Sequence, residues 1–288
     1  MGFFPSVSPI LAELDQRGIA EHGDDWDRQV ATAILSFNSA FGNGNLLLRN
    51  RKLIDYGDLA TQAAYVFMYV AGHADFLHMV MRRGKDEGAF TSLKKPEIRV
   101  TSIGGGPGSD LLALVHYLRS LTPDERPQLI RYRILDKQPN WHEILQTVAH
   151  FQRGTFDVEV TFEPVDVTIP VQWQDVSCAS DDLLIMNFFV SEVCRLREAA
   201  SVRSCFESLL ISLRHDSVVM FNDSAFPSCY EYFDNRIAAV GGFRRLVAES
   251  VRLDAHPDFD ELFRECMVRF GRTPKLGSKA AYRVLIKQ

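Results

Sequence analysis

Short apolar runs alternate with segments of helical periodicity along the chain from residue 98 onward. Apolar runs of about four to eight residues are typical of buried strands, whereas apolar residues three and four positions apart are typical of helices with one buried face. The pattern predicts strands at 98–103, 129–135, 156–162, 183–187 and 218–222, and helices at 111–121, 140–151, 205–213 and 230–240. Strands that alternate with helices form βαβ units, so a parallel sheet is expected.

Two further strand candidates, the runs at 243–253 and 281–287, follow the last of these helices. The polar stretch between them contains Gly271 and Pro274, and such a connection allows the two runs to pair as antiparallel strands. The expected fold class is therefore α/β, with a doubly wound, mostly parallel seven-stranded sheet and an antiparallel C-terminal strand.

The first 95 residues show only the helical spacing. They predict helical segments at 9–17, 26–41 and 58–83, and in the last of these the apolar positions 67, 70, 71 and 74 share one face. Glycines and lysines at 84–96 end this helix. We therefore expect an N-terminal helical extension at 1–95 and an α/β domain at 96–288.

Composition restricts the partners and the compartment. The net charge of −5 argues against a broad basic surface for nucleic acid, although it leaves room for a local basic patch. The five cysteines include no C-x-x-C pair, so we expect reduced thiols, a cytoplasmic location and no metal site. No stretch reaches the roughly 18 apolar residues of a membrane span, and no membrane contact is expected.

A glycine-rich turn, IGGGPGSD at 103–110, joins the first predicted strand to the helix that follows it. Glycine adopts positive φ and lets the backbone approach a ligand closely, and the amides at a helix N-terminus face that ligand. The dinucleotide pattern G-x-G-x-x-G does not fit, because its third glycine would be Ser109 counted from Gly104, or Leu111 counted from Gly106. The pattern G-x-G-x-G fits.

This turn resembles the first motif of class I S-adenosylmethionine-dependent methyltransferases, by motif over 97–223 and by pattern alone over 224–288. The resemblance implies S-adenosylmethionine as cofactor, bound by residues in the turn and at the strand ends. These residues are Ser102, Gly104, Gly105, Gly106, Gly108, Asp110, Asp136, Asp166, Asn187 and Phe188.

Asp136 ends the second predicted strand, where a carboxylate can accept hydrogen bonds from both hydroxyls of a ribose lying over the turn. The alternative for Asp136 is a helix cap or a turn. Asp166 follows the third strand and either accepts from the adenine amine or starts a turn. Asn187 and Phe188 are similar to the fourth motif of the family, which lines the transfer site.

Ser102 departs from the family pattern, which usually has Asp or Glu two residues before the first glycine. A neutral serine cannot pair with the ammonium group of the cofactor, so we expect Asp110 or the Gly104 carbonyl to do so. The alternative for Asp110 is a first-turn acid that the helix dipole favours.

Methyl transfer from a sulfonium is an in-line displacement that depends chiefly on position and exclusion of water. A base is needed only where the acceptor loses a proton, and our catalytic candidates are Glu192, Tyr65 and His73. Their alternatives are a first-turn acid for Glu192, a packed tyrosine for Tyr65 and a structural histidine for His73.

The sequence thus predicts a methyltransferase that acts on a small molecule or, second, on a protein or RNA. Two alternatives stay open: an NAD(P)-dependent oxidoreductase, and a non-catalytic protein that binds S-adenosylmethionine as a sensor. Ser102 is the residue that keeps the second alternative open. The acceptor and the oligomeric state are not indicated.

Overall fold

The computed structural model describes residues 2–41, 54–151, 156–194, 196 and 199–288. These residues form two compact units, each described here by itself. The helical unit comprises Met1–Asp75 and Asp254–Gly277, and the sheet unit comprises Phe76–Leu253 and Ser278–Gln288. The boundary predicted between residues 95 and 96 separates domains expected to fold independently, which compactness alone does not test. It stays a prediction.

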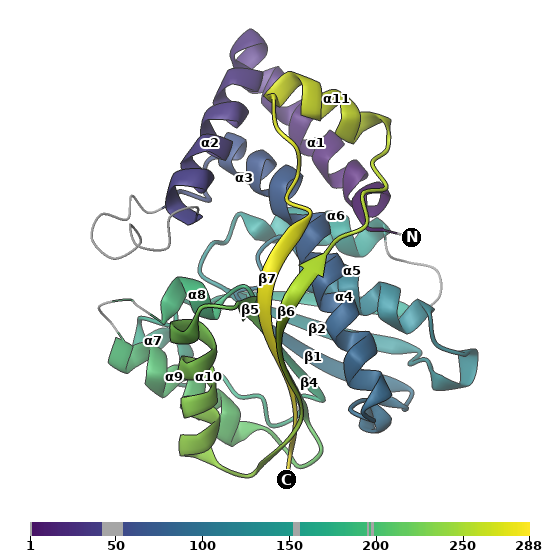
Figure 1. Ribbon diagram of the computed structural model, residues 1–288, viewed down its shortest axis with the longest axis vertical. Coiled ribbons are helices and arrows are strands. Elements are labelled where there is room, and N and C mark those ends of the chain that lie inside the picture. Colours follow the sequence, from purple (N-terminus) through teal and green to yellow (C-terminus); the bar gives the residue numbers. More distant parts are fainter. Residues whose placement is uncertain (1, 42–53, 152–155, 195, 197–198) are drawn as a thin grey trace. The chain divides into compact units, whose positions relative to one another are not determined.

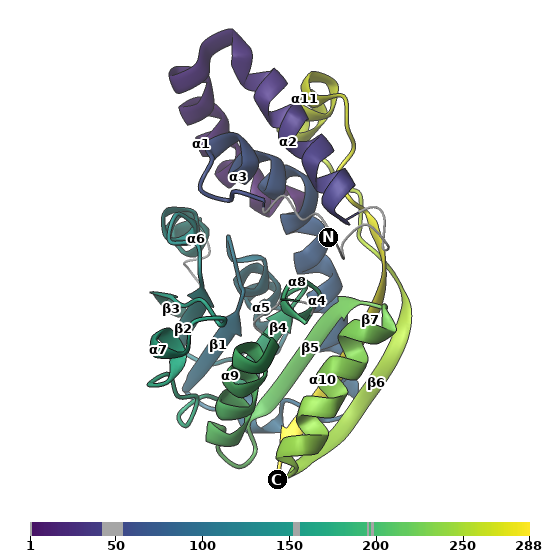
Figure 2. The same ribbon diagram turned by 90° about the vertical axis from the view of Figure 1, so that its left-hand side faces the viewer.

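The sheet unit is built on a seven-stranded sheet in the order β3-β2-β1-β4-β5-β7-β6. Its strands are β1 (Glu97–Ile103), β2 (Leu129–Asp136), β3 (Asp157–Pro164), β4 (Leu183–Asn187), β5 (Val218–Ser224), β6 (Phe243–Asp254) and β7 (Gly277–Lys287). Strands β1 to β5 pair in parallel, and β7 is antiparallel to β5. Figure 2 shows β3 at one edge and β6 at the other.

Helices cover both faces of this sheet. They are α5 (Ser109–Arg119), α6 (Trp141–Phe151), α7 (Pro170–Trp173), α8 (Val190–Val193), α9 (Ala199–Ser212) and α10 (Pro227–Val240). Figure 1 shows α9 and α10 on one side and α5 on the opposite side, as right-handed crossovers require when the chain leaves β1 in one direction and β4 in the other. The predicted fold class is confirmed.

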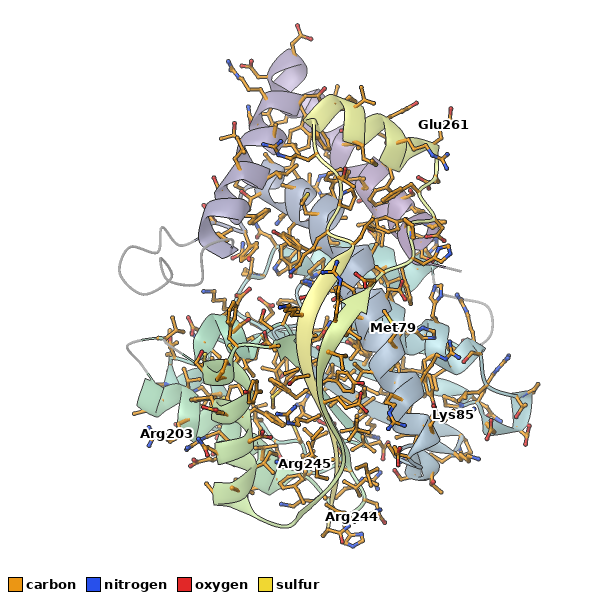
Figure 3. The ribbon with its side chains drawn as sticks, in the orientation of Figure 1. Met79, Lys85, Arg203, Arg244, Arg245 and Glu261 are labelled. Atoms are coloured by element: carbon orange, nitrogen blue, oxygen red, sulfur yellow. The ribbon has the colours of Figure 1, made fainter. Side chains whose placement is uncertain are left out.

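An apolar core lies between the sheet and the helices α9 and α10. Phe221 of β5 and Phe233 of α10 stack there with ring centroids 4.5 Å apart. Charged side chains such as Lys85, Arg203 and Arg245 are exposed on the surface (Figure 3). The core therefore fixes β4 and β5, the two central strands that carry part of the candidate site.

The helical unit contains α1 (Phe4–His22), α2 (Trp26–Phe41), α3 (Leu59–Tyr65) and α11 (Glu261–Phe270). A π-helical turn at Val66–Val70 joins α3 to α4 (Ala71–Asp86), so the helix predicted at 58–83 is one continuous run. The unit border falls inside α4, between Asp75 and Phe76. No helix in the described ranges is long and apolar enough to cross a membrane.

Helix α11 was not predicted, because its segment was read as part of a polar connection. Its buried residues Phe263, Cys266 and Phe270 have helical spacing, which is the signal that could have found it. Phe263 contacts Phe4 of α1, with ring centroids 4.9 Å apart. Arg269 donates to Asp15 and so ties α11 to α1, at 2.9 Å from Nη2 to Oδ1.

Candidate functional site

The glycine turn after β1 adopts the backbone conformation for which glycine is suited. Gly104, Gly106 and Gly108 have φ of 65°, 50° and 93°, a region that side chains with a Cβ avoid. The Gly108 N–H donates to the Gly105 carbonyl at 3.0 Å, and α5 begins at once. A Cβ on Gly105 would lie 2.7 Å from Ser102 Oγ, so close approach requires glycine at this position as well.

The space in front of the turn differs between its first two left-handed glycines. A Cβ on Gly104 would lie 2.2 Å from the ring of Phe189, so this ring covers Gly104. A Cβ on Gly106 would meet, among the described atoms outside its chain neighbours, only Trp141 Nε1 at 3.9 Å. A ligand that crosses the turn therefore has room at Gly106. Phe189 is not among the residues that the sequence predicts for this site.

Asp136, at the end of β2, is held against the turn by backbone donors. Its Oδ2 accepts from the Gly106 N–H at 3.0 Å, and its Oδ1 accepts from the Gln138 N–H at 2.9 Å. The residue is partly exposed, and desolvation raises the pKa of its carboxyl to about 6. The contact with Gln138 forms a turn, which is the alternative role that the sequence leaves open for Asp136. Each Asp136 carboxylate oxygen still has a lone pair that can accept from a ligand hydroxyl.

Asp110 is the centre of a buried hydrogen-bond network behind the turn. Its Oδ2 accepts from Ser102 Oγ at 2.5 Å, and its Oδ1 accepts from Asn187 Nδ2 at 2.8 Å. Asp110 is 1% exposed. Desolvation raises the pKa of its carboxyl to about 6, against the lowering effect of these hydrogen bonds. Three predicted cofactor residues from β1, α5 and β4 are thus brought together.

Asn222 of β5 extends this network and was missed by the sequence analysis. It is the register partner of Asn187, and its Nδ2 donates to Asn187 Oδ1 at 2.8 Å. Asn222 is fully buried, and its Oδ1 has no hydrogen-bond partner among the described residues. Strand ends alone could have indicated it, since Asn187 and Asn222 end the two neighbouring predicted strands.

Phe188 follows β4 in a strained backbone conformation. Its φ is 54°, which costs about 1–3 kcal/mol for a bulky residue and persists where the surrounding structure enforces it. The Phe188 N–H donates to the Asn222 carbonyl at 2.7 Å, and this contact helps to hold the turn. Such strain is typical of functional sites.

Asp166 has a local role in the structure. Its Oδ1 accepts from the Thr168 N–H at 2.9 Å and from Thr168 Oγ1 at 2.6 Å, and its own N–H donates to Gln172. These contacts form a turn, which is one of the two roles that the sequence leaves open for Asp166. The adenine contact stays a prediction.

Glu192 lies in the first turn of α8, which agrees with its alternative as a first-turn acid. Asp223, at the end of β5, accepts from the Ser191 N–H at 2.8 Å and so fixes the start of this short helix. Desolvation raises the pKa of the Asp223 carboxyl to about 6. The catalytic role of Glu192 stays a prediction.

Tyr65 and His73 belong to the helical unit, where they form one aromatic row with Tyr69. Ring centroids are 5.3 Å apart for Tyr65 and Tyr69, and 5.5 Å apart for Tyr69 and His73. Burial and the nearby Lys275 ammonium hold the pKa of His73 well below its usual value. His73 is therefore neutral at pH 7, and the roles of both residues as acid or base stay predictions.

The pH dependence of unfolding tests the buried state of Asp110. The pKa of this carboxyl is raised from 3.8 to about 6 on folding, so the folded state keeps a proton that the unfolded state loses between these values. Its contribution to the free energy of unfolding is then largest below pH 4 and is lost as the pH rises to about 6. In Asp110→Asn this part of the pH dependence of the free energy of unfolding, measured with urea, is expected to disappear. An unchanged pH dependence would contradict the raised pKa of the buried carboxyl.

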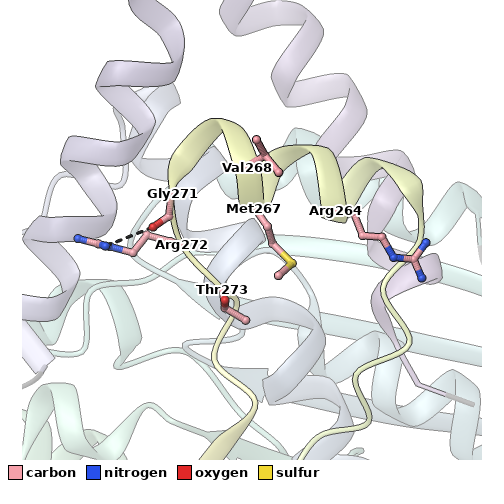
Figure 4. Close-up of a pocket in the computed structure, with 6 residues that line it drawn as sticks. All are labelled: Arg264, Met267, Val268, Gly271, Arg272 and Thr273. Carbon is pink, nitrogen blue, oxygen red and sulfur yellow. Dashed lines mark hydrogen bonds between the residues drawn. The ribbon is translucent and has the colours of Figure 1, made fainter.

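A hollow on the helical unit lies along α11 (Figure 4). Its lining residues are Arg264, Met267, Val268, Gly271, Arg272 and Thr273. None of them is a predicted site residue, and Arg272 Nη1 donates to the Gly271 carbonyl at 3.2 Å. In the part of the chain that the structure describes, no group of three or more His, Cys, Asp or Glu side chains could hold a metal ion.

No protein-family model and no curated protein sequence matches this chain. Many of the solved structures that resemble it are described as methyltransferases. A putative RNA methyltransferase from Pyrococcus horikoshii is 14% identical, with a TM-score of 0.42 over 91% of this chain and 97% of its own. The mitomycin 7-O-methyltransferase MmcR is also 14% identical, with a TM-score of 0.43 over 96% of this chain and 72% of its own.

The N-methyltransferase NodS from Bradyrhizobium japonicum is 9% identical, with a TM-score of 0.41 over 74% of this chain and 98% of its own. Similarity at this level assigns neither an activity nor an acceptor.

Proposed function

We propose that this chain is an S-adenosylmethionine-dependent methyltransferase whose acceptor is a small molecule. The observation that carries the proposal is the pairing of a left-handed glycine turn with a carboxylate. Gly106 leaves room for a ligand, and its N–H holds the Asp136 carboxylate at the same point. A nucleoside needs both features, a backbone without side chains and an acceptor for its ribose hydroxyls.

The residues present fit the cofactor at two further positions. The Asp110 carboxylate accepts a hydrogen bond from Ser102, and Ser102 occupies the position where methyltransferases of the resembled family usually have an acid. A negative charge is therefore available behind the turn for an ammonium group, although it comes from α5 and not from β1. The buried Asn222 Oδ1, without a partner among the described residues, adds an acceptor to this network.

The Ser102–Asp110 contact weakens the reason for a non-catalytic sensor, because that alternative depended on the neutral Ser102. The NAD(P) alternative gains no support, because the left-handed glycines are those of the G-x-G-x-G pattern.

The bound cofactor would supply an electrophilic methyl group on a sulfonium. The chain would orient it through Asp136 and the turn, while Phe188 and Phe189 line the adjoining strand end with apolar rings that exclude water. Where the acceptor is a hydroxyl, we propose Glu192 as the group that takes its proton. Tyr65 and His73 are our candidates from the helical unit.

Thermal unfolding with S-adenosylhomocysteine tests the proposed function. A ligand that binds only the folded state, present at 100 times its dissociation constant, is expected to raise the free energy of unfolding by about 2.7 kcal/mol. NADH at the same concentration serves as the matched control and is expected to produce no shift. A shift with NADH and none with S-adenosylhomocysteine would reject the proposal in favour of the dinucleotide alternative.

A further inference from the structure

The sheet unit brings two thiols together beside the candidate site. Cys194 directly follows α8, and Cys229 lies in the first turn of α10. None of the five cysteines is in a disulfide, and Cys194 and Cys229 share a hydrogen bond between their thiols. Neither thiol has a role in the proposed methyl transfer, so the pair requires its own explanation.

The two thiols are held in place by elements anchored to the end of one strand. Asp223 of β5 accepts from the Ser191 N–H at 2.8 Å and thereby fixes α8. Helix α10 begins at Pro227, shortly after β5 ends, and it packs against α8. A short loop and a fixed short helix thus carry the two cysteines, and little ordering is needed to bring one sulfur to the other.

The surroundings give the two thiols different properties. Cys229 is 2% exposed, and its hydrogen bond with Cys194, its burial and the nearby Asp223 carboxylate all raise the pKa of its thiol. Cys194 is partly exposed and lies near Tyr232. The Arg236 guanidinium lies over the Tyr232 ring, 5.6 Å from the ring centroid. Cys229 therefore keeps its proton, whereas the partly exposed Cys194 is the sulfur that meets an external reagent first.

We propose that Cys194 and Cys229 form a redox-active dithiol that low-molecular-weight disulfides, such as oxidised glutathione, convert to an intramolecular disulfide. The Cys194 thiolate attacks one sulfur of the reagent, forms a mixed disulfide and releases the first glutathione thiolate. Cys229, on losing its proton, then attacks the Cys194 sulfur, closes the bond and releases the second glutathione thiolate. Both protein thiols are oxidised, the reagent is reduced to two thiols, and the two protein protons pass to these products.

The experiment uses the full chain in buffers of reduced and oxidised glutathione. Free thiols are blocked with an alkylating reagent at each ratio, and the protein is then analysed by intact mass and by peptide mapping. Relative to the reduced and alkylated chain, we expect two fewer alkyl groups on the oxidised chain, a cross-linked peptide containing Cys194 and Cys229, and reversal by a dithiol reductant. This test does not depend on methyl transfer, so its failure leaves the proposed function untouched.

Two variants sharpen the result. In Cys229→Ser the second step is lost, so a glutathione adduct on Cys194 is expected to accumulate in place of the cross-link. Cys205→Ala removes a fully buried thiol in α9 and is expected to leave the cross-link unchanged. A stable glutathione adduct on Cys194 in the unmodified chain would overturn the proposal. So would a folded chain in which neither thiol reacts with oxidised glutathione alone, a result that needs no variant.

Discussion

Gly106→Leu is expected to abolish the binding of S-adenosylhomocysteine while the sheet unit stays folded. Gly106 has φ of 50°, and a Cβ there would point into space in which, among described atoms outside its chain neighbours, only Trp141 Nε1 lies within 4 Å. A leucine would occupy the volume that the ligand needs. We expect affinity to fall by at least about 100-fold, or roughly 2.7 kcal/mol, in isothermal titration calorimetry.

The matched control is Gly241→Leu. Gly241 also lies in the sheet unit with φ of 69°, and a Cβ on it would have no described atom outside its chain neighbours within 4 Å. Both variants place a side chain at a positive φ, but only Gly106 lies in the turn after β1. Affinity close to that of the unmodified chain in Gly106→Leu, or an equal loss in both variants, would contradict the proposed binding site.

Asp136→Asn is expected to weaken the same ligand by about 100-fold, because hydrogen bonds to a charged acceptor are each worth about 1.5–3 kcal/mol. Asparagine keeps one oxygen for the Gly106 or the Gln138 N–H, so the turn retains an acceptor. The pKa of Asp136 is raised to about 6. Binding to the unmodified chain should therefore weaken as the pH falls below 6, whereas binding to Asp136→Asn should lose this dependence.

Two other acids of the sheet unit provide the comparison. Asp157→Asn changes an exposed carboxylate at the start of β3 and is expected to leave affinity unchanged. Asp166→Asn tests the open choice for that residue, since a turn role predicts little change in affinity and an adenine contact predicts a clear loss. If Asp136→Asn bound as tightly as Asp157→Asn, the ribose role of Asp136 would be wrong.

Local sequence was sufficient to predict the turn because its requirements are local. Glycines at 104, 106 and 108 are needed where φ is positive, and an apolar run before them with a helical pattern after them fixes the turn between β1 and α5. The strands followed from the same logic, since each predicted run has the length of a strand. The parallel pairing of β1 to β5 followed from the alternation of strands and helices.

The buried network behind the turn could not be read in this way. Ser102, Asp110, Asn187 and Asn222 come from four elements, and what joins them is the register of β4 with β5 and the packing of α5. No local pattern shows that the Asp110 carboxylate meets Ser102. The sequence therefore indicated that the acid was missing at position 102, and the structure shows a carboxylate supplied to it from the next helix.

The helical unit draws on two separate stretches of chain, and this has a consequence for fragment design. A fragment that starts at residue 96 keeps α11 but lacks α1, so Phe263 loses the ring of Phe4, and Arg269 loses the carboxylate of Asp15. A fragment that ends at residue 75 lacks α11 altogether. Neither cut keeps α1 and α11 together, whereas joining residue 253 to residue 278 through a short linker would remove only the C-terminal segment of the helical unit.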